Sequence, residues 1–399
     1  MKQFDITYFH GPFADFVVRE EVIADIAASG MTLMPLHYST EVNQQALPVL
    51  KRYGLRAIVS DPRIDEVYRT DDIDAADAAA RAVVRDYREF DNVIGWDIVD
   101  EPSAAKFPVL QAIVAAFRRH SPQMETVINL FPNYATPAQL GTPDYPSHLE
   151  SFVHTVRPHL LSYDHYHFLG RKNRNQILQL DVDEREKQIR LSAENLKNRG
   201  GFFENIEICR AIAQKYGIPP MLIVLLTEHG PYRNLTIGEL FWEVNMCLAY
   251  GMKRISYFTY WEPAYSEHWQ WTNAMCDTEG RRMQHWYDVR AMNAVVAPIG
   301  RMLFEAQSEA VFHIGEPQEG ARRFTGYGAV TAIDGENGVV GFFTGGLVYL
   351  VNRDFLRSNT FTLHSSRPLA VFRDGDFAAS EGNEVTVTLG AGEAVLLRA

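Results

Sequence analysis

The stretch VIGWDIVDEP, residues 93–102, has the composition of a buried β-strand that ends on two adjacent carboxylates and a proline. Its apolar residues form a run of strand length, and Pro102 lacks the backbone N–H that a central strand needs. Asp100 and Glu101 therefore mark the carboxyl end of this strand. Taken alone, the pattern is also typical of a strand that ends in solvated acids before a helix, so its meaning depends on the rest of the chain.

Similar apolar runs recur before about residue 264, and segments of helical period such as residues 15–30 and 74–90 separate them. The eight runs begin at Ile6, Met31, Leu55, Val93, Met124, Leu160, Met221 and Arg254. Strands that alternate with helices indicate parallel βαβ units, and eight units in about 250 residues predict a (β/α)8, or TIM, barrel. An open doubly wound sheet is the alternative, but the segment FHGPFADF after the first run lacks the glycine-rich turn of its dinucleotide-binding form.

The pattern changes after residue 304. Short alternating runs separated by Gly, Asn and Asp turns, such as LVYLVNRD and EVTVTL, are typical of antiparallel strands. We predict an α/β protein with a catalytic barrel over residues 1–304 and a small C-terminal antiparallel β-sandwich over residues 305–399.

Composition limits the partners of the chain. The net charge of −12, from 38 basic and 50 acidic residues, opposes binding to nucleic acid. Three cysteines without paired spacing indicate no disulfide framework. The N-terminal residues lack a signal-peptide pattern, and no apolar run approaches membrane-spanning length. We expect a cytoplasmic protein without a membrane partner, although a secreted chain with its leader removed would look the same. The oligomeric state is not readable.

Two glutamates stand at strand ends where barrel enzymes carry their chemistry. Glu101 follows the fourth run and Glu228 follows the seventh, three βα units later, so both are expected at the carboxyl end of the barrel. Glycoside hydrolysis needs two such groups. One carboxyl protonates the leaving oxygen, and the other, about 5–5.5 Å away in retaining enzymes, attacks the anomeric carbon.

The motifs GWDIVDEP and LLTEHG resemble the large superfamily of retaining glycoside hydrolases on (β/α)8 barrels, the clan A type. The resemblance covers about two thirds of the chain. It implies that Glu101 is the acid/base and Glu228 the nucleophile of a retaining β-glycosidase with an oligo- or polysaccharide substrate. It also implies that Tyr166 hydrogen-bonds the nucleophile.

The sequence departs from that superfamily at Asp100. The superfamily usually has Asn there, which contacts the sugar 2-hydroxyl, whereas an Asp carboxylate accepts from that hydroxyl and cannot donate. A neighbouring carboxylate also disfavours ionisation of Glu101, which would help to keep this general acid protonated.

Other residues near strand ends are candidates for binding sugar. Trp261 is a natural platform for a sugar ring, which Trp269 and Trp271 would extend, and His10 and His37 would hydrogen-bond sugar hydroxyls. Alternation along YDHYHF places Asp164 and Tyr166 on one face of the sixth strand and His165 and His167 on the other. The predicted substrate-binding set is His10, His37, Asp100, Asn133, Asp164, Trp261 and Trp269.

Two alternatives remain open. A metal-dependent hydrolase would use His165 and His167 as an H-x-H pair, with His10, His37 and His229 nearby, but the first strand supplies one histidine where a metal site wants a pair. A non-catalytic barrel would bind glycans through Trp261 and the aromatic loops, although the presence of both carboxylates argues against it. We predict no metal and no other cofactor.

Overall fold

The protein is described by a computed structural model that covers residues 1, 3–170, 197–265, 270–380 and 382–399. All eight predicted strands are present and form one parallel sheet. Its members are β1 (Asp5–Tyr8), β2 (Leu33–Leu36), β3 (Arg56–Val59), β4 (Val93–Asp100), β5 (Glu125–Leu130), β6 (Leu161–Asp164), β9 (Pro220–Leu225) and β11 (Arg254–Phe258).

The order of strands in this sheet confirms the barrel. The order is β1-β11-β9-β6-β5-β4-β3-β2, so each strand lies beside its neighbour in the chain and β1 lies beside the last strand, β11. The backbone N–H of Thr32, just before β2, donates to the carbonyl of Ile6 in β1 at 2.9 Å and brings the two ends together. A doubly wound sheet would reverse its strand order partway, which this sheet does not.

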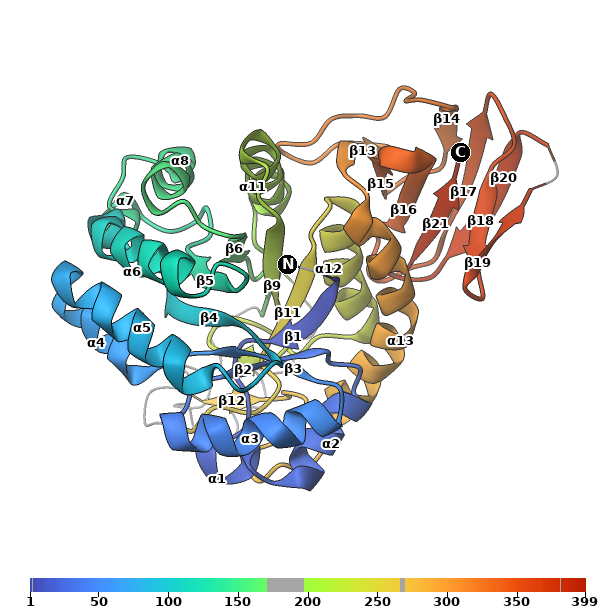
Figure 1. Cartoon of the computed structure of the whole chain (residues 1–399). Helices are drawn as coiled ribbons and strands as arrows, with labels where there is room; N and C mark the ends of the chain where they lie inside the picture. The colour runs from blue at the N-terminus through green and yellow to red at the C-terminus, as the bar shows by residue number, and fades with distance from the viewer. Residues whose placement is uncertain (2, 171–196, 266–269, 381) are drawn as a thin grey trace, which may run out of the picture.

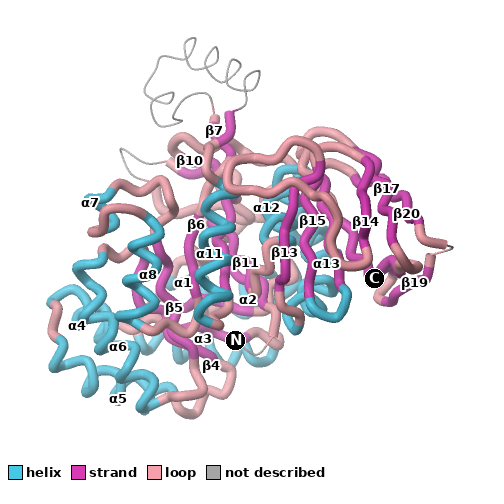
Figure 2. Tube along the Cα trace, turned by 90° about the horizontal axis from the view of Figure 1, so that it is seen from above, coloured by secondary structure: helices cyan, strands magenta, loops and turns pink. Residues whose placement is uncertain are grey.

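Helices surround the strands, as Figures 1 and 2 show. They are α1 (Ala14–Val17), α2 (Glu20–Ala28), α3 (Thr40–Arg52), α4 (Pro62–Thr70), α5 (Ala76–Tyr87), α6 (Phe107–His120), α7 (Pro137–Leu140), α8 (Tyr145–Val156), α11 (Phe202–Tyr216), α12 (Ile237–Ala249) and α13 (Gln284–Glu305), with 3₁₀ turns at Ile73–Ala75, Ala104–Lys106 and Thr344–Gly346. Local signals set several ends. Thr236 and Glu239 form a capping box at the start of α12, and Gly217 ends α11 with a φ of 64°.

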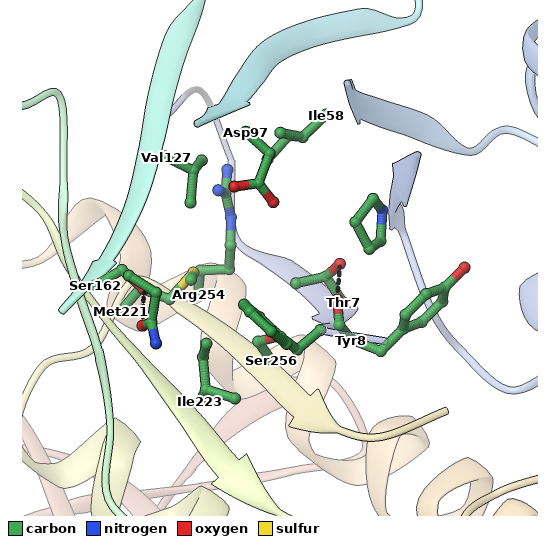
Figure 3. A pocket seen from close by; sticks show the side chains of 13 residues that line it. Thr7, Tyr8, Ile58, Asp97, Val127, Ser162, Met221, Ile223, Arg254 and Ser256 are labelled. Carbon is green, nitrogen blue, oxygen red and sulfur yellow. Dashed lines mark hydrogen bonds between the residues drawn. The ribbon is translucent and has the colours of Figure 1, made fainter. Parts of the chain in front are cut away.

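Side-chain alternation along β4 separates packing from chemistry. Trp96 points outward and stacks on Phe117 of α6, with ring centroids 5.0 Å apart, and its indole N–H donates to Ser121 Oγ at 3.0 Å. The next residue, Asp97, points into the barrel (Figure 3). One face of β4 therefore packs against α6, and the other face directs the Asp97 side chain into the barrel.

The C-terminal region is a pair of antiparallel sheets, as predicted. One sheet has the order β13-β15-β16-β21-β18-β19 and the other β14-β17-β20. The strands are β13 (Ser308–Ile314), β14 (Val330–Asp334), β15 (Gly338–Phe343), β16 (Leu347–Asn352), β17 (Asn359–Ser365), β18 (Ala370–Arg373), β19 (Asp376–Ala379), β20 (Glu384–Leu389) and β21 (Ala394–Arg398). Val340, Leu350 and Phe361 belong to the apolar core between the two sheets.

The sandwich packs on α12 of the barrel (Figure 1). Alternation along β16 gives Leu350 to the core of the sandwich and Tyr349 to the barrel side, where the Tyr349 hydroxyl donates to Asn245 Oδ1 at 2.7 Å. Trp242 of α12 is buried and donates its indole N–H to the carbonyl of Arg353 at 3.0 Å. Both faces of this sheet are therefore covered.

Two short sheets complete the strands. They pair β7 (Phe168–Leu169) with β8 (Lys197–Asn198), and β10 (Glu228–His229) with β12 (Trp271–Thr272). Cys209, Cys247 and Cys276 are free and buried. Among the described residues, no helix has both the length and the apolar character needed to cross a membrane.

Candidate active site

Glu101 lies where β4 gives way to the following loop. Its backbone N–H donates to the carbonyl of Asn129 in β5 at 2.8 Å, which is the last bond between these two strands. Its φ of 46° is in the left-handed region, so the chain turns away from the strand at this residue. The Glu101 carboxyl is hydrogen-bonded to that of Asp164 at the end of β6. The predicted acid/base and a predicted substrate-binding residue are thus in direct contact.

One amide joins two carboxyl groups. The Asn129 side-chain amide donates to Asp100 Oδ1 at 2.9 Å and to Asp164 Oδ1 at 3.0 Å. Its carbonyl oxygen accepts from the Ser162 hydroxyl at 2.9 Å, which fixes the orientation of the amide. Since the amide nitrogen carries two hydrogens, it serves both aspartates at once. We call Asp100, Glu101 and Asp164 the carboxyl cluster.

The carboxyl cluster holds protons near neutral pH. Burial, followed by the charge of Asp100, raises the pKa of Glu101 to about 7, although the hydrogen bond with Asp164 acts in the opposite direction. Burial and the charges of Glu101 and Asp100 raise the pKa of Asp164 well above its ordinary value. Burial likewise raises the pKa of Asp100. Like charges this close cannot all ionise together, so a protonated carboxyl is available here to act as a general acid.

Glu228 is held at the end of β9 by backbone bonds to β11. The N–H groups of Leu226 and Thr227 both donate to the carbonyl of Phe258, at 2.8 and 3.0 Å, and the Thr227 hydroxyl lies 2.9 Å from that of Thr259. Glu228 then pairs with Thr272 in the β10–β12 sheet. Both predicted catalytic glutamates therefore follow the carboxyl ends of barrel strands.

The Glu228 carboxylate accepts a hydrogen bond that the sequence did not predict. Asn273, directly after β12, donates from Nδ2 to Glu228 Oε2 at 2.7 Å. Tyr166 lies instead in an aromatic group, with its ring centroid 5.2 Å from Tyr232 and 5.5 Å from Phe258. Within the described residues, no hydrogen bond joins the Tyr166 hydroxyl to Glu228, so the role assigned to Tyr166 stays a prediction.

His37 and His10 lie beside each other on the β1–β2 side of the barrel end. His37 Nε2 is 2.9 Å from Asp97 Oδ2. Burial lowers the pKa of His37, but the hydrogen bond and charge of Asp97, helped by Asp65 and Asp100, outweigh burial and raise it overall. Burial and the nearby His37 lower the pKa of His10 to about 4, so His10 is neutral at pH 7.

An open depression of about 650 Å³ lies next to the carboxyl cluster. Asp100 joins the cluster to this depression, and His37 and Asp97 also line it. The cavity inside the barrel is about 30 Å³ (Figure 3), against the roughly 300–1,000 Å³ typical of ligand pockets. The outer depression therefore has room for a sugar, and the barrel interior does not.

Two other predicted binding residues have different surroundings. The Asn133 amide donates to the carbonyl of Gly201 at 3.1 Å and to Glu204 Oε2 at 3.3 Å, which ties the loop after β5 to the start of α11. The Trp261 ring is only 1% exposed and packs against Phe13 and Phe16. A covered ring has no free face to stack on a sugar, so this structure corrects the expectation that Trp261 is an open platform.

The remaining aromatic candidates are Trp269 and Trp271. Trp269 lies outside the described residues. Trp271 in β12 is half-buried, and its ring centroid is 4.5 Å from that of His229.

His165 and His167 take part in packing. His165 Nδ1 lies 3.0 Å from Asn205 Oδ1, and the His167 ring stacks on Trp242 with centroids 4.8 Å apart. Burial lowers the pKa of His165 to about 4 and that of His167 to about 3. In the part of the chain that the structure describes, no group of three or more His, Cys, Asp or Glu side chains is arranged to hold a metal ion.

The sequence reasoning missed Asp97, Asn129 and Asn273. The first two had a signal, because each is a polar residue with apolar residues on both sides in its strand. Asn273 had none, because its contact with Glu228 depends on how the loop after β11 folds.

Comparison with known proteins supports the architecture. No family model matches the sequence, and no curated protein matches it. Solved structures do match. A catalytic mutant of a GH42 β-galactosidase from G. stearothermophilus has a TM-score of 0.62 at 8% identity, over 100% of this chain and 98% of that one. A family 5 glycoside hydrolase from Bacteroides vulgatus has a TM-score of 0.56 at 9% identity, over 99% and 89%.

A β-galactosidase from the psychrophilic Marinomonas ef1 has a TM-score of 0.50 at 10% identity, over 75% of this chain. The alignment spans only 61% of that longer β-galactosidase. With its eight-stranded parallel barrel and C-terminal sandwich, this chain has the fold found in these glycoside hydrolases.

Proposed function

We propose that this protein is a retaining β-glycosidase in which Glu101 is the acid/base and Glu228 is the nucleophile. The observation that carries the proposal is the carboxyl cluster, which raises the pKa of Glu101 to about 7 at the end of β4, while Glu228 follows β9. A general acid works best when its pKa is near the operating pH. The fold shared with a β-galactosidase and a family 5 glycoside hydrolase supports the same reaction class.

The proposed reaction has two steps. Glu228 attacks the anomeric carbon while protonated Glu101 donates its proton to the leaving oxygen, which gives a glycosyl-enzyme ester and a free alcohol. Glu101, now a carboxylate, then removes a proton from water as that water attacks the same carbon and releases Glu228. A carboxyl with a pKa of about 7 serves both steps, since it gains and loses its proton near neutral pH.

The carbohydrate is proposed to bind in the open depression beside Asp100. His37 and Asp97 form a hydrogen-bonded pair on its wall, and such pairs are well suited to hold sugar hydroxyls. β-Galactosides and β-glucosides are the first substrates to test. No cofactor takes part in this scheme.

The test is a panel of aryl β-glycosides and oligosaccharides, with the anomer of the first-formed product followed by ¹H NMR. Retention is expected, and Glu228→Gln should lower kcat by at least about 10³-fold without changing the circular dichroism spectrum. Replacing Glu228 by Gly and adding azide should restore turnover as an α-glycosyl azide. An inverted product, or an unchanged rate in Glu228→Gln, would refute the proposal.

The alternatives give different results in the same panel. Activity that a chelator abolishes and zinc restores would favour a metal hydrolase. Binding across the panel without any hydrolysis would indicate a glycan-binding barrel.

A further inference from the structure

The backbone of Asn273 is held by a helix of the barrel. Its carbonyl oxygen lies 2.5 Å from Nδ1 of His285, a buried residue of α13 whose Nε2 is 3.0 Å from the carbonyl of Leu235. The loop after β11 is thus fixed at Asn273 by a buried side chain.

The backbone conformation of Asn273 is also restricted. Its φ of 59° is in the left-handed region, which asparagine tolerates better than most residues with a side chain. The side chain then donates from Nδ2 to Glu228 Oε2 at 2.7 Å, a short distance typical of a hydrogen bond to a charged acceptor. An asparagine in an exposed turn would not need the backbone contact with His285 or the side-chain bond to Glu228.

We infer that Asn273 is a positioning residue for the nucleophile, an inference that rests on the proposed function of Glu228. The amide holds one carboxylate oxygen in place, so the side chain does not have to be ordered when substrate binds. Asn273 donates to Glu228 itself, and therefore acts through the nucleophile.

Two substitutions separate the amide from the backbone. Asn273→Gly removes the donor and keeps a residue that adopts the left-handed conformation without strain. Asn273→Asp keeps the size of the side chain but places a second carboxylate against Glu228. The matched control is Asn337→Gly in the sandwich, where Asn337 has a φ of 54° and its Oδ1 accepts from Arg353 Nη2 at 3.2 Å. The control removes an asparagine of the same backbone conformation far along the chain from the barrel.

The first readout does not depend on turnover. The side-chain carboxyl of Glu228 is observed by ¹³C NMR in glutamate-labelled protein at one fixed pH, with its signal assigned from Glu228→Gln. The signal should shift or broaden in Asn273→Gly and in Asn273→Asp, because the carboxylate loses the donor that holds it in one position. Asn337→Gly should leave the signal where it is.

The second readout is kinetic. On the best aryl β-glycoside of the panel, Asn273→Gly should lower kcat about 10- to 100-fold with a smaller change in KM, because the amide positions the reacting group and not the substrate. An NMR signal that stays unchanged in both Asn273 variants would overturn the inference, and so would an unchanged kcat. Full activity of Glu228→Gln would instead refute the proposed function, so the two failures are distinguishable.

Discussion

Replacing Glu101 by Gln is expected to stabilise the folded protein at alkaline pH. The pKa of Glu101 is raised from 4.5 to about 7, so the folded state binds this proton more tightly than the unfolded state does. Folding therefore loses stability as pH rises through this window, and the loss is complete above about pH 7. The raised pKa corresponds to at most about 3 kcal/mol. Because Glu101 is only half-buried and shares its proton with Asp164, we expect about 1–2 kcal/mol.

Urea unfolding of both proteins at about pH 5 and about pH 8.5 measures this effect. The stability gained on Glu101→Gln should be about 1–2 kcal/mol larger at the higher pH, since glutamine mimics the protonated acid and does not titrate. The control is Asp144→Asn at the start of α8. Hydrogen bonds from Ser147 lower the pKa of Asp144 below 3.8, so its contribution is complete at both assay pH values and the effect of the substitution should not differ between them. If Glu101→Gln raised the free energy of unfolding equally at both pH values, the pKa of Glu101 would not be raised, and the carboxyl cluster would not act as described.

Two further substitutions test a pair on the wall of the depression and the contact between the sandwich and α12. Asp97→Asn should cost about 0.5–1 kcal/mol more unfolding free energy at pH 6 than at pH 9. The pKa of His37 is raised from 6.5, so the stability from its charged form is present below pH 6.5 and is lost as pH rises. An equal loss at both pH values in urea unfolding would contradict this. Gly341→Ala should cost about 1–3 kcal/mol of unfolding free energy, because the new Cβ would lie 2.3 Å from the carbonyl oxygen of Ala249 in α12. The control Gly200→Ala places its Cβ in open space and should cost much less. Equal melting temperatures for the two variants would show that the sandwich does not pack on α12 as described.

Most of the fold could be predicted from the periodicity of apolar residues in the sequence. Apolar runs of strand length separated by helical segments are enough to predict a parallel barrel, and alternating runs after residue 304 are enough to predict antiparallel sheets. The ends of the runs also predicted that Glu101 and Glu228 follow the fourth and seventh barrel strands, and the structure places them there. Their catalytic roles stay a proposal.

Contacts between distant residues could not be predicted in the same way. Trp261 follows a barrel strand as a platform residue would, yet Phe13 and Phe16, about 245 positions earlier in the chain, cover its ring. Asn273 reaches Glu228 only because its loop folds back onto the end of β9. The local sequence pattern predicts which strand or loop a residue belongs to. The contacts of its side chain depend on how loops from different strands pack together.

Asp100 stands where the superfamily that the motifs resemble usually has Asn, and the structure gives this difference a physical consequence. An asparagine there would bring a second amide to the site but no charge to disfavour ionisation of Glu101. With aspartate, the Asn129 amide bridges residue 100 to Asp164, and the charge of Asp100 is the main influence after burial that raises the pKa of Glu101. In the proposed reaction, Asp100 offers no donor to the 2-hydroxyl of a sugar, but it strengthens the hold of Glu101 on its proton. The amide that makes this arrangement stable is supplied from the neighbouring strand, β5, rather than from the motif itself.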